Sequence, residues 1–205
     1  MFERQTSGPG QHRAPLELKE THALGKSPQL ITPTGRVITE RSAIALYLIN
    51  RYDTDGKFQL NLEDPEHDAV REEELLSLGG ASLNPILMTQ FVFEQLRHKS
   101  PFFIRPLIGS IASMVNKAFL SKENENMTTY LDNELQGRDW FMGTSEPTRA
   151  DFCLHWYMDM GFQTGLTDFG KAPNLKAWLD RCKDRPAWKK ALQKGNGYDL
   201  MSSMS

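Results

Sequence analysis

Apolar side chains recur at helical spacing along most of this chain, and only its first fifty or so residues mix that spacing with short strand-like runs. Ile44, Tyr47, Leu48 and Tyr52 would share one face of a helix that we expect over residues 40–52. The same spacing, with proline and glycine as boundaries, predicts helices over 15–22, 65–98 and 105–134, and others beginning at Thr148, Pro173 and Pro186. The chain after residue 65 is therefore expected to be helical throughout.

Two β-branched runs in the first part of the chain predict a β-hairpin. Residues 28–32 and 36–39 are joined by Pro33-Thr34-Gly35, a typical turn sequence. A further short strand is expected over 1–5, which gives the order strand, helix, strand, strand, helix. Residues 53–65 are polar and irregular, so we expect a linker there between an α/β unit and a helical unit.

Two segments of the helical part suggest how it packs. Pro85 is expected to kink the helix over 65–98, and the small residues 79–82 before it would let another backbone approach closely. Residues 102–115 are the most apolar stretch, but Arg105 and Pro106 interrupt it, and it is shorter than the roughly 20 residues of a membrane span. We expect this stretch to be buried in the helical core.

Composition excludes several classes of function. The 205 residues carry a net charge of −2, so no basic field is available to hold a nucleic acid. The two cysteines, Cys153 and Cys182, are too few for a disulfide framework and lack zinc-site spacing, so we expect two buried thiols and no metal. The first residues contain charge and glycine where a signal peptide needs an apolar run, so the expected compartment is the cytosol.

The tetrapeptide Gly25-Lys26-Ser27-Pro28 places a proline at the entry to a strand, where it cannot donate to the ladder. A cis bond between Ser27 and Pro28 would turn the backbone N–H and C=O of Ser27 outward, to pair with a peptide-like ligand. An ordinary trans proline at the strand entry is the alternative, and the frequency of cis X–Pro bonds taken alone favours it.

Two further motifs stand at helix starts. Residues 39–44 (T-E-R-S-A-I) lead into a helix whose unpaired N–H groups attract a carboxylate, with Thr39 as the expected N-cap; capping without a ligand explains the motif equally well. Thr148 and Asp151 match a capping box with a structural role. We expect His155, on the same helix, to be a partly buried histidine with satisfied hydrogen bonds.

In this order the motifs resemble the glutathione S-transferase superfamily and, within it, the fungal glutathione transferases of the yeast Gtt type. The similarity is carried by G-K-S-P, T-E-x-x-A-I and T-x-A-D, and it extends over nearly the whole chain. It implies an α+β, thioredoxin-like N-terminal domain, truncated here, followed by an all-α C-terminal domain. The expected boundaries are 1–53 for the first domain, 54–64 for the linker and 65–205 for the second domain.

The resemblance also implies a glutathione site. In the family, the residue before a cis-proline pairs through its backbone with the cysteinyl part of glutathione, which assigns this role to Ser27 beside Pro28. Lys26 would meet the glycine carboxylate, and Glu40 would hold the γ-glutamyl end. The family has serine at the next position, where this chain has Arg41. Arg41 could pair with the γ-glutamyl carboxylate, point to solvent, or fill the seat and block it.

The family's first domain opens with a strand and a helix that carry its catalytic Ser, Tyr or Cys, and no residue of this chain matches that position. We expect a glutathione transferase that uses glutathione as co-substrate and conjugates it to apolar electrophiles, a detoxification reaction. In the chain as written we expect weak or absent activity and a less stable first domain. An upstream exon supplying the segment would restore the enzyme.

A non-catalytic binding or assembly module of the same fold is the alternative function. The resemblance further implies a homodimer in the cytoplasm. By analogy with the fungal relatives, peripheral contact with the endoplasmic reticulum membrane through residues 102–115 is a less favoured alternative.

Overall fold

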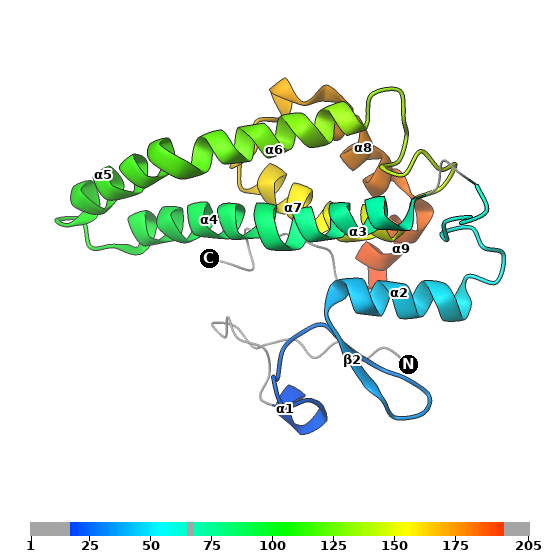
Figure 1. Cartoon of the computed structure of the whole chain (residues 1–205). Coiled ribbons are helices and arrows are strands. Elements are labelled where there is room, and N and C mark those ends of the chain that lie inside the picture. The colour runs from blue at the N-terminus through cyan, green and yellow to red at the C-terminus, as the bar shows by residue number, and fades with distance from the viewer. Residues whose placement is uncertain (1–16, 65–67, 195–205) are drawn as a thin grey trace.

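The computed structural model describes residues 17–64 and 68–194. Its first part contains α1 (Leu18–Thr21), β1 (Gln29–Ile31), β2 (Val37–Thr39) and α2 (Arg41–Tyr52), and lies below the long helices in Figure 1. The hairpin prediction is confirmed: β1 and β2 pair antiparallel, with Leu30 opposite Ile38. The strand predicted over 1–5 lies outside the described residues.

The hairpin turn depends on one glycine. Gly35 has a φ of 81° and donates its N–H to the carbonyl of Thr32 at 2.9 Å, while the N–H of Thr32 bonds the carbonyl of Arg36 at 2.9 Å. A residue with a Cβ atom is strained at such a φ, so the Pro-Thr-Gly sequence selects this turn.

Helix α2 begins one residue later than expected. Its N-cap is Glu40, whose side chain makes no capping hydrogen bond. The prediction that Thr39 caps this helix is wrong, because Thr39 is the last residue of β2 and pairs with Gln29. Pairing in the strand keeps the backbone of Thr39 extended, and the helix can start only after the chain turns at Glu40.

The helical part follows the predicted order. Two long rods lie side by side in Figure 1, the first made of α3 and α4 and the second of α5 and α6, and α7 packs against the first rod. The elements are α3 (Ala69–Ser77), η1 (Leu78–Leu83), α4 (Asn84–Lys99), α5 (Arg105–Val115), η2 (Asn116–Leu120), α6 (Ser121–Glu134), α7 (Arg149–Gln163), η3 (Phe169–Lys171), α8 (Pro173–Asp184) and α9 (Pro186–Lys194).

Each long rod contains a π-helical segment that the apolar pattern did not reveal. Segment η1 ends directly before the Asn84-Pro85 pair, at the place where we expected a kink. Proline lacks the N–H that would continue the α-helical bonding, and a π turn is one way to accommodate that loss. At the place where we expected a kink, the structure therefore has a π-helical segment.

By length and mean hydropathy alone, the continuous helix Ala69–Lys99 could cross a membrane, and it is the one such helix within 17–64 and 68–194. A core helix of a soluble protein passes the same test. Leu75, Leu83 and Leu87 of this helix are fully buried in the protein core, whereas Val92 and Leu96 are 48% and 50% exposed.

The core forms around α7. Leu154 and Met158 of this helix are fully buried and pack with Trp178 of α8 and Leu131 of α6. Both cysteines are free and buried, as predicted. Among the described residues, no group of three His, Cys, Asp or Glu is placed to hold a metal ion.

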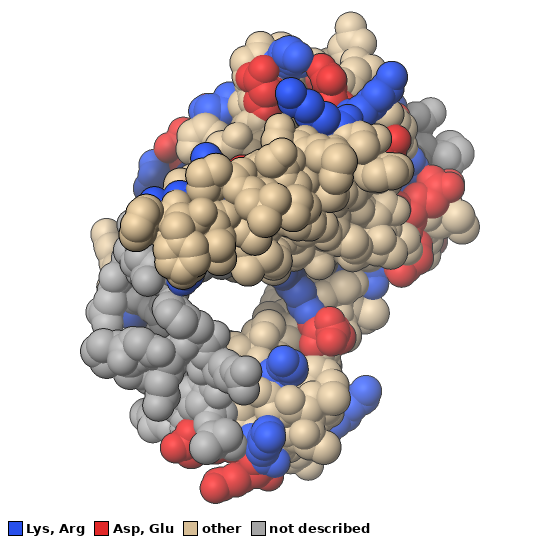
Figure 2. Space-filling model, turned by 90° about the vertical axis from the view of Figure 1, so that its left-hand side faces the viewer, with Lys and Arg blue, Asp and Glu red and all other residues tan. Residues whose placement is uncertain are grey.

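The prediction that residues 102–115 are buried is wrong. The side chains of Phe102, Phe103 and Leu107 are 82%, 71% and 63% exposed, and Met114 is 64% exposed. Phe102 and Phe103 lie where α4 turns back into α5, and Leu107 and Met114 follow along α5. This end of the molecule faces the viewer in Figure 2, and uncharged side chains cover much of that face. The stretch is apolar enough for a core, but the hairpin of α4 and α5 extends beyond the other helices.

Candidate functional site

The predicted site motifs meet in one cavity. The Ser27–Pro28 peptide bond is cis. A cavity of about 320 Å³ is lined by Lys26, Ser27, Glu40 and Arg41, with Pro28, Thr39 and Ser42 beside them. The structure thus brings together every residue that the sequence assigned to the ligand site, from the loop before β1 and from the start of α2.

Two charged side chains of this cavity, Lys26 and Glu40, lack ion-pair partners among the described residues. Neither the ammonium of Lys26 nor the carboxylate of Glu40 makes an ion pair or hydrogen bond with another residue in the described part of the chain. A cation and an anion that line one cavity without such partners can bind a ligand that itself carries both charges. A zwitterionic or multiply charged small molecule fits this arrangement.

The backbone of Glu40 is strained. Its φ is 69° and its ψ is 129°, and it is the one described residue other than glycine with a positive φ. Such a conformation costs about 1–3 kcal/mol in a residue with a side chain, and it persists where the surroundings enforce it, often at binding sites. The sharp turn from β2 into α2 enforces it here and places Glu40 at the cavity wall.

Arg41 points toward the helical part of the molecule. Its guanidinium carbon lies 4.9 Å from the ring centre of Tyr157 and 5.2 Å from that of Trp156, both on α7. Its Nη1 donates a hydrogen bond to the carbonyl of Cys153 at 3.3 Å. Of the three placements the sequence left open, a side chain that points to solvent is not the one observed, because these contacts direct the half-buried Arg41 toward α7.

The helical part supplies a second wall that the motifs did not predict. Leu76, Gly80, Cys153 and Tyr157 line the cavity on this side, and Leu24 before the cis-proline loop completes the lining. The apolar periodicity of these helices predicted only a core face, so nothing in the sequence distinguished Tyr157 from a core aromatic residue. The cavity therefore joins a polar wall from the hairpin part to a less polar wall from the helices.

Tyr157 has room beside the first rod because residue 79 is glycine. A Cβ atom on Gly79 would lie 2.8 Å from Cε2 of Tyr157 and 2.9 Å from Cδ2 of Leu154. We predicted that the small residues 79–82 would let another backbone approach closely. The close neighbours of Gly79 are instead these two side chains of α7. The glycine in η1 therefore sets where the tyrosine ring lies.

Cys153 lines the cavity, but its thiol is unsuited to act as a nucleophile. Burial raises the pKa of Cys153 to about 11, and the positive charge of Arg41 offsets only part of that effect. The thiolate is the reactive form of cysteine, so Cys153 stays protonated and unreactive near neutral pH.

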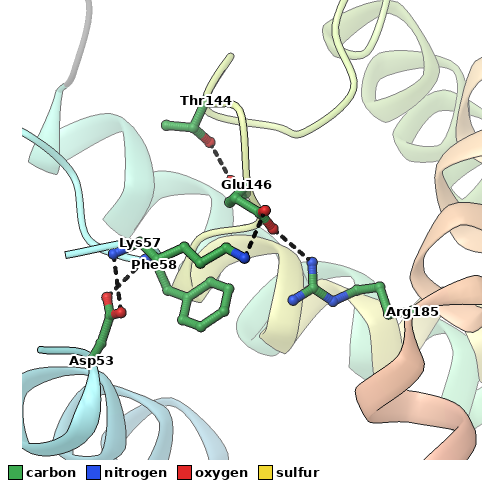
Figure 3. Close-up of polar contacts among 6 residues, drawn as sticks. All are labelled: Asp53, Lys57, Phe58, Thr144, Glu146 and Arg185. Carbon is green, nitrogen blue, oxygen red and sulfur yellow. Dashed lines mark hydrogen bonds and ion pairs between the residues drawn. The ribbon is translucent and has the colours of Figure 1, made fainter. Parts of the chain in front are cut away.

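The linker after α2 is held against the helical part, as Figure 3 shows. Lys57 forms an ion pair with Glu146 at 3.0 Å, and Arg185 of α8's C-terminal end bonds the same carboxylate at 3.1 Å. Asp53 accepts hydrogen bonds from the N–H groups of Lys57 and Phe58 at 3.0 and 2.7 Å. These contacts hold the end of α2 and so help to fix the cavity between the two walls.

The predicted capping box is present at the start of α7. The carboxylate of Asp151 accepts the N–H of Thr148 at 2.9 Å, the N–H of Phe141 at 3.2 Å and the indole N–H of Trp178 at 2.8 Å. The box therefore also ties α7 to α8, the helix that carries Trp178. This rigid helix start supports the segment that presents Cys153 and Tyr157 to the cavity.

His155 packs between aromatic rings, away from the cavity lining. Its ring centre is 4.6 Å from that of Trp188 and 6.4 Å from that of Trp178. Burial lowers the pKa of His155. Its Nε2 is buried and has no hydrogen-bond partner in the described part of the chain, so the prediction of satisfied hydrogen bonds is wrong for this atom.

Residues 102–186 match the family model of the glutathione S-transferase C-terminal domain. Glutathione S-transferase 3 of Schizosaccharomyces pombe is 28% identical over 188 residues, which are 89% of this chain and 73% of the relative. Glutathione S-transferase 1 of Saccharomyces cerevisiae is 26% identical over 173 residues, 82% of this chain and 73% of the relative.

Solved structures share the fold. Ure2p5 of Phanerochaete chrysosporium, crystallised with 1-(S-glutathionyl)-2,4-dinitrobenzene, superposes with a TM-score of 0.67 at 22% identity, covering 88% of this chain and 80% of that one. A sphingomonad glutathione S-transferase in complex with glutathione gives a TM-score of 0.63 at 24% identity, covering 87% and 78%. Fold, motifs and relatives agree: residues 102–186 match a glutathione S-transferase C-terminal domain, and the chain is similar to yeast glutathione S-transferases over most of its length.

Proposed function

We propose that this chain binds glutathione in the cavity between the hairpin part and α7, and that it is a glutathione transferase acting on apolar electrophiles. The observation that supports this most directly is a pair of charges, Lys26 and Glu40, which have no ion-pair partner among the described residues and share one cavity with the Ser27 backbone. Glutathione carries a carboxylate at its glycine end, and an ammonium and a carboxylate at its γ-glutamyl end. The cavity offers opposite charges to match them.

Each polar residue then has one role. Lys26 binds the glycine carboxylate as a point charge, and the backbone of Ser27, beside Pro28, pairs with the cysteinyl unit. Glu40 accepts hydrogen bonds from the γ-glutamyl ammonium. The strained backbone of Glu40 is consistent with a residue held in place for a ligand.

The electrophile would approach from the helical wall of the cavity, formed by Leu76, Gly80 and Tyr157. The glutathione sulfur attacks an electrophilic carbon as the thiolate; a carbon–sulfur bond forms, the leaving group departs with the electron pair of its bond, and the thiol proton is released. No residue of this chain is assigned to stabilise the thiolate, and the high pKa of Cys153 excludes it as a reacting thiolate.

Replacing Glu40 by glutamine is expected to weaken glutathione binding about 10- to 100-fold, because a charge-assisted hydrogen bond to the ammonium is lost. Glu40→Gly should weaken binding at least as much while raising the free energy of unfolding by about 1 kcal/mol, because glycine tolerates a positive φ. Isothermal titration calorimetry and urea unfolding measure the two effects.

Glu123→Gln on α6 is the matched control, since Glu123 is exposed and outside the cavity; its dissociation constant should equal that of the wild type. Wild-type affinity in Glu40→Gln would contradict the assigned role. Absence of glutathione binding by the wild-type chain would contradict the proposed site altogether.

A non-catalytic binding or assembly module is the second candidate, and it is favoured by the lack of an assigned catalytic residue. The two candidates differ in one measurement. A transferase converts 1-chloro-2,4-dinitrobenzene to the glutathionyl product faster than free glutathione does, with release of chloride. A binding module retains glutathione in calorimetry and leaves that rate at its background value.

We propose the domain boundaries expected from the sequence, with residues 1–53 as the glutathione-binding domain, 54–64 as the linker and 65–205 as the helical domain. The contacts of Lys57 and Phe58 with the helical part support a linker that fixes the two domains relative to each other. We also propose that the protein is a cytoplasmic homodimer, as its resemblance to the superfamily implies.

Peripheral membrane contact is the alternative for localisation, and one surface favours it. We define the α4–α5 tip as the exposed side chains of Leu96, Phe102, Phe103, Ile104 and Leu107. Residues 95–122 around it contain five Lys or Arg and no Asp or Glu. Exposed aromatic side chains flanked by cations suit the boundary of an anionic lipid surface.

The double variant Phe102→Ser with Phe103→Ser should then reduce co-sedimentation with phosphatidylserine vesicles at least tenfold, because each buried aromatic contributes about 1.5–3 kcal/mol. Leu62→Ser, at an equally exposed apolar residue of the linker, is the control and should sediment as the wild type does. If the wild type does not sediment with these vesicles, the α4–α5 tip does not bind this lipid surface, and the membrane alternative is contradicted.

A further inference from the structure

One carboxylate joins three segments that are far apart in the sequence. Glu146, in the loop between α6 and α7, pairs through Oε1 with the ammonium of Lys57 at 3.0 Å and through Oε2 with the guanidinium of Arg185 at 3.1 Å (Figure 3). Lys57 belongs to the linker, and Arg185 is the C-cap of α8. We call these three residues the Glu146 network. An isolated exposed ion pair contributes little to stability, but charges joined in a network contribute more.

An aromatic ring of the linker reinforces the Glu146 network. The ring centre of Phe58 lies 5.6 Å from that of Phe152 on α7, and the guanidinium carbon of Arg185 lies 5.5 Å from the ring centre of Phe58. The side chains of Glu146 and Arg185 are 31% and 22% exposed, so water screens their interaction only in part. Phe152 directly precedes Cys153, a residue of the cavity lining. The linker is therefore attached close to the helical wall of the cavity.

The attachment of the linker reaches the hairpin part through α2. Asp53, the C-cap of α2, accepts the backbone N–H groups of Lys57 and Phe58 at 3.0 and 2.7 Å. The start of the same helix is held at the cavity, where Arg41 donates a hydrogen bond to the carbonyl of Cys153 on α7. Helix α2 is thus tied to the helical part at both ends, directly at its start and through the linker at its end.

Two kinds of ligand would respond differently to a loss of this tie. The groups proposed to bind glutathione, on Lys26, Ser27 and Glu40, all belong to the hairpin part, so its binding does not require a fixed helical wall. A glutathione conjugate also carries a substituent on sulfur that would contact Leu76 and Tyr157 of the helical wall. If the two walls move relative to each other, the apparent affinity for the conjugate falls by the fraction of molecules that hold both walls in place.

We propose that Glu146 is a positioning residue that, through the linker and α2, fixes the spacing of the two cavity walls. It thereby sets the preference of the site for S-substituted glutathione over glutathione. Glu146 is outside the cavity lining, so it acts through Lys57 and Phe58 and not by contact with the ligand. This inference rests on the proposed binding of glutathione and adds to it the network that holds the helical wall against the hairpin wall.

A ligand pair tests this assignment. Calorimetry on the full chain at neutral pH and low salt would compare glutathione with S-hexylglutathione. We expect the wild type to bind S-hexylglutathione at least about tenfold more tightly, because the hexyl group buries apolar surface at the helical wall. Glu146→Gln should reduce this preference about three- to tenfold and leave the dissociation constant of glutathione within about twofold of the wild type. Lys57→Met, which keeps the pair of Glu146 with Arg185, should reduce the preference similarly.

Two further readouts separate positioning from a general loss of stability. In the double variant Glu146→Gln with Lys57→Met the two effects should not add, because either substitution breaks the same tie. Raising sodium chloride to about 1 M should reduce the preference of the wild type and leave that of Glu146→Gln unchanged, because salt screens the ion pairs. Glu125→Gln is the matched control: Glu125 also pairs with a lysine, Lys171, at 2.9 Å, but outside the cavity lining, and its preference should equal that of the wild type.

Three results would overturn the inference. An undiminished preference in Glu146→Gln and Lys57→Met would show that the network does not set the wall spacing, while glutathione binding stays intact. Equal weakening of both ligands by Glu146→Gln would assign this residue to the fold alone. A wild type that binds neither ligand would overturn the proposed function, and this inference with it. Thermal unfolding checks each variant; were Glu146→Gln unfolded, Lys57→Met, at a side chain that is 52% exposed, would still decide.

Discussion

Replacing Asp151 by alanine is expected to lower the free energy of unfolding by about 3–5 kcal/mol. The carboxylate is buried and accepts hydrogen bonds from the backbone N–H of Phe141, the N–H and hydroxyl of Thr148, and the indole N–H of Trp178. Its removal leaves these donors without an acceptor in the core. Urea unfolding followed by circular dichroism measures the change.

Asp68→Ala is the matched control, because Asp68 also caps a helix, α3, but is exposed, and its carboxylate accepts one hydrogen bond within the described part of the chain, from Val70. Its loss should lower stability by only about 0.5–1 kcal/mol. Asp151→Asn should destabilise the protein nearly as much as the alanine variant, since either orientation of the amide turns its NH₂ toward donors. Similar effects of Asp151→Ala and Asp68→Ala would show that the network is not a major source of stability.

Alanine at position 79 should destabilise the protein by about 1–3 kcal/mol, even though alanine favours a helix more than glycine does. The new Cβ atom would meet the ring of Tyr157 at 2.8 Å and Leu154 at 2.9 Å. Leu154 is fully buried, so this side chain has no room to move away. Thermal and urea unfolding measure the loss.

The adjacent glycine offers an internal control. A Cβ atom on Gly80 would meet only the Tyr157 hydroxyl, at an ordinary 3.6 Å. Gly80→Ala should therefore gain up to about 1 kcal/mol from helix propensity, so that two alanine substitutions one residue apart change stability with opposite signs. Equal effects at the two positions would mean that the close packing of Tyr157 against η1 does not constrain the fold.

Sequence patterns that span only a few residues were sufficient to predict where most helices and the hairpin lie. The five helical starts after residue 65 were expected close to their observed places, because proline, capping residues and apolar spacing act within a few residues. The hairpin was expected for the same reason, since Gly35 and its neighbours set the turn locally. The capping box at Thr148 and Asp151 was also read from four residues, although its bond to Trp178 was not.

Errors arose where a distant part of the molecule decides the outcome. Residues 102–115 have the composition of a core, yet they are exposed because the rods extend past their neighbours. Thr39 was predicted to be an N-cap, but its backbone pairs with Gln29 in the hairpin. The π segments were also missed, because apolar periodicity does not distinguish them from α-helix.

The sequence by itself determined the polar half of the candidate site. Lys26, Ser27, Pro28 and Glu40 lie within fifteen residues, and short motifs were enough to place them together as predicted ligand contacts. Their roles toward glutathione stay predictions. The same motifs left Arg41 with three possible placements.

Only the tertiary structure decided what surrounds Arg41. The helix that contacts it is 112 residues away at Cys153, and its approach depends on a glycine in a third segment that admits Tyr157. Packing of side chains between distant helices obeys no local spacing rule, because it follows from which surfaces the whole chain buries together. The physical reason for the difference is the sequence separation of the interacting residues. Turns and caps depend on residues a few positions apart, whereas the second wall of the cavity depends on contacts between residues far apart in the sequence.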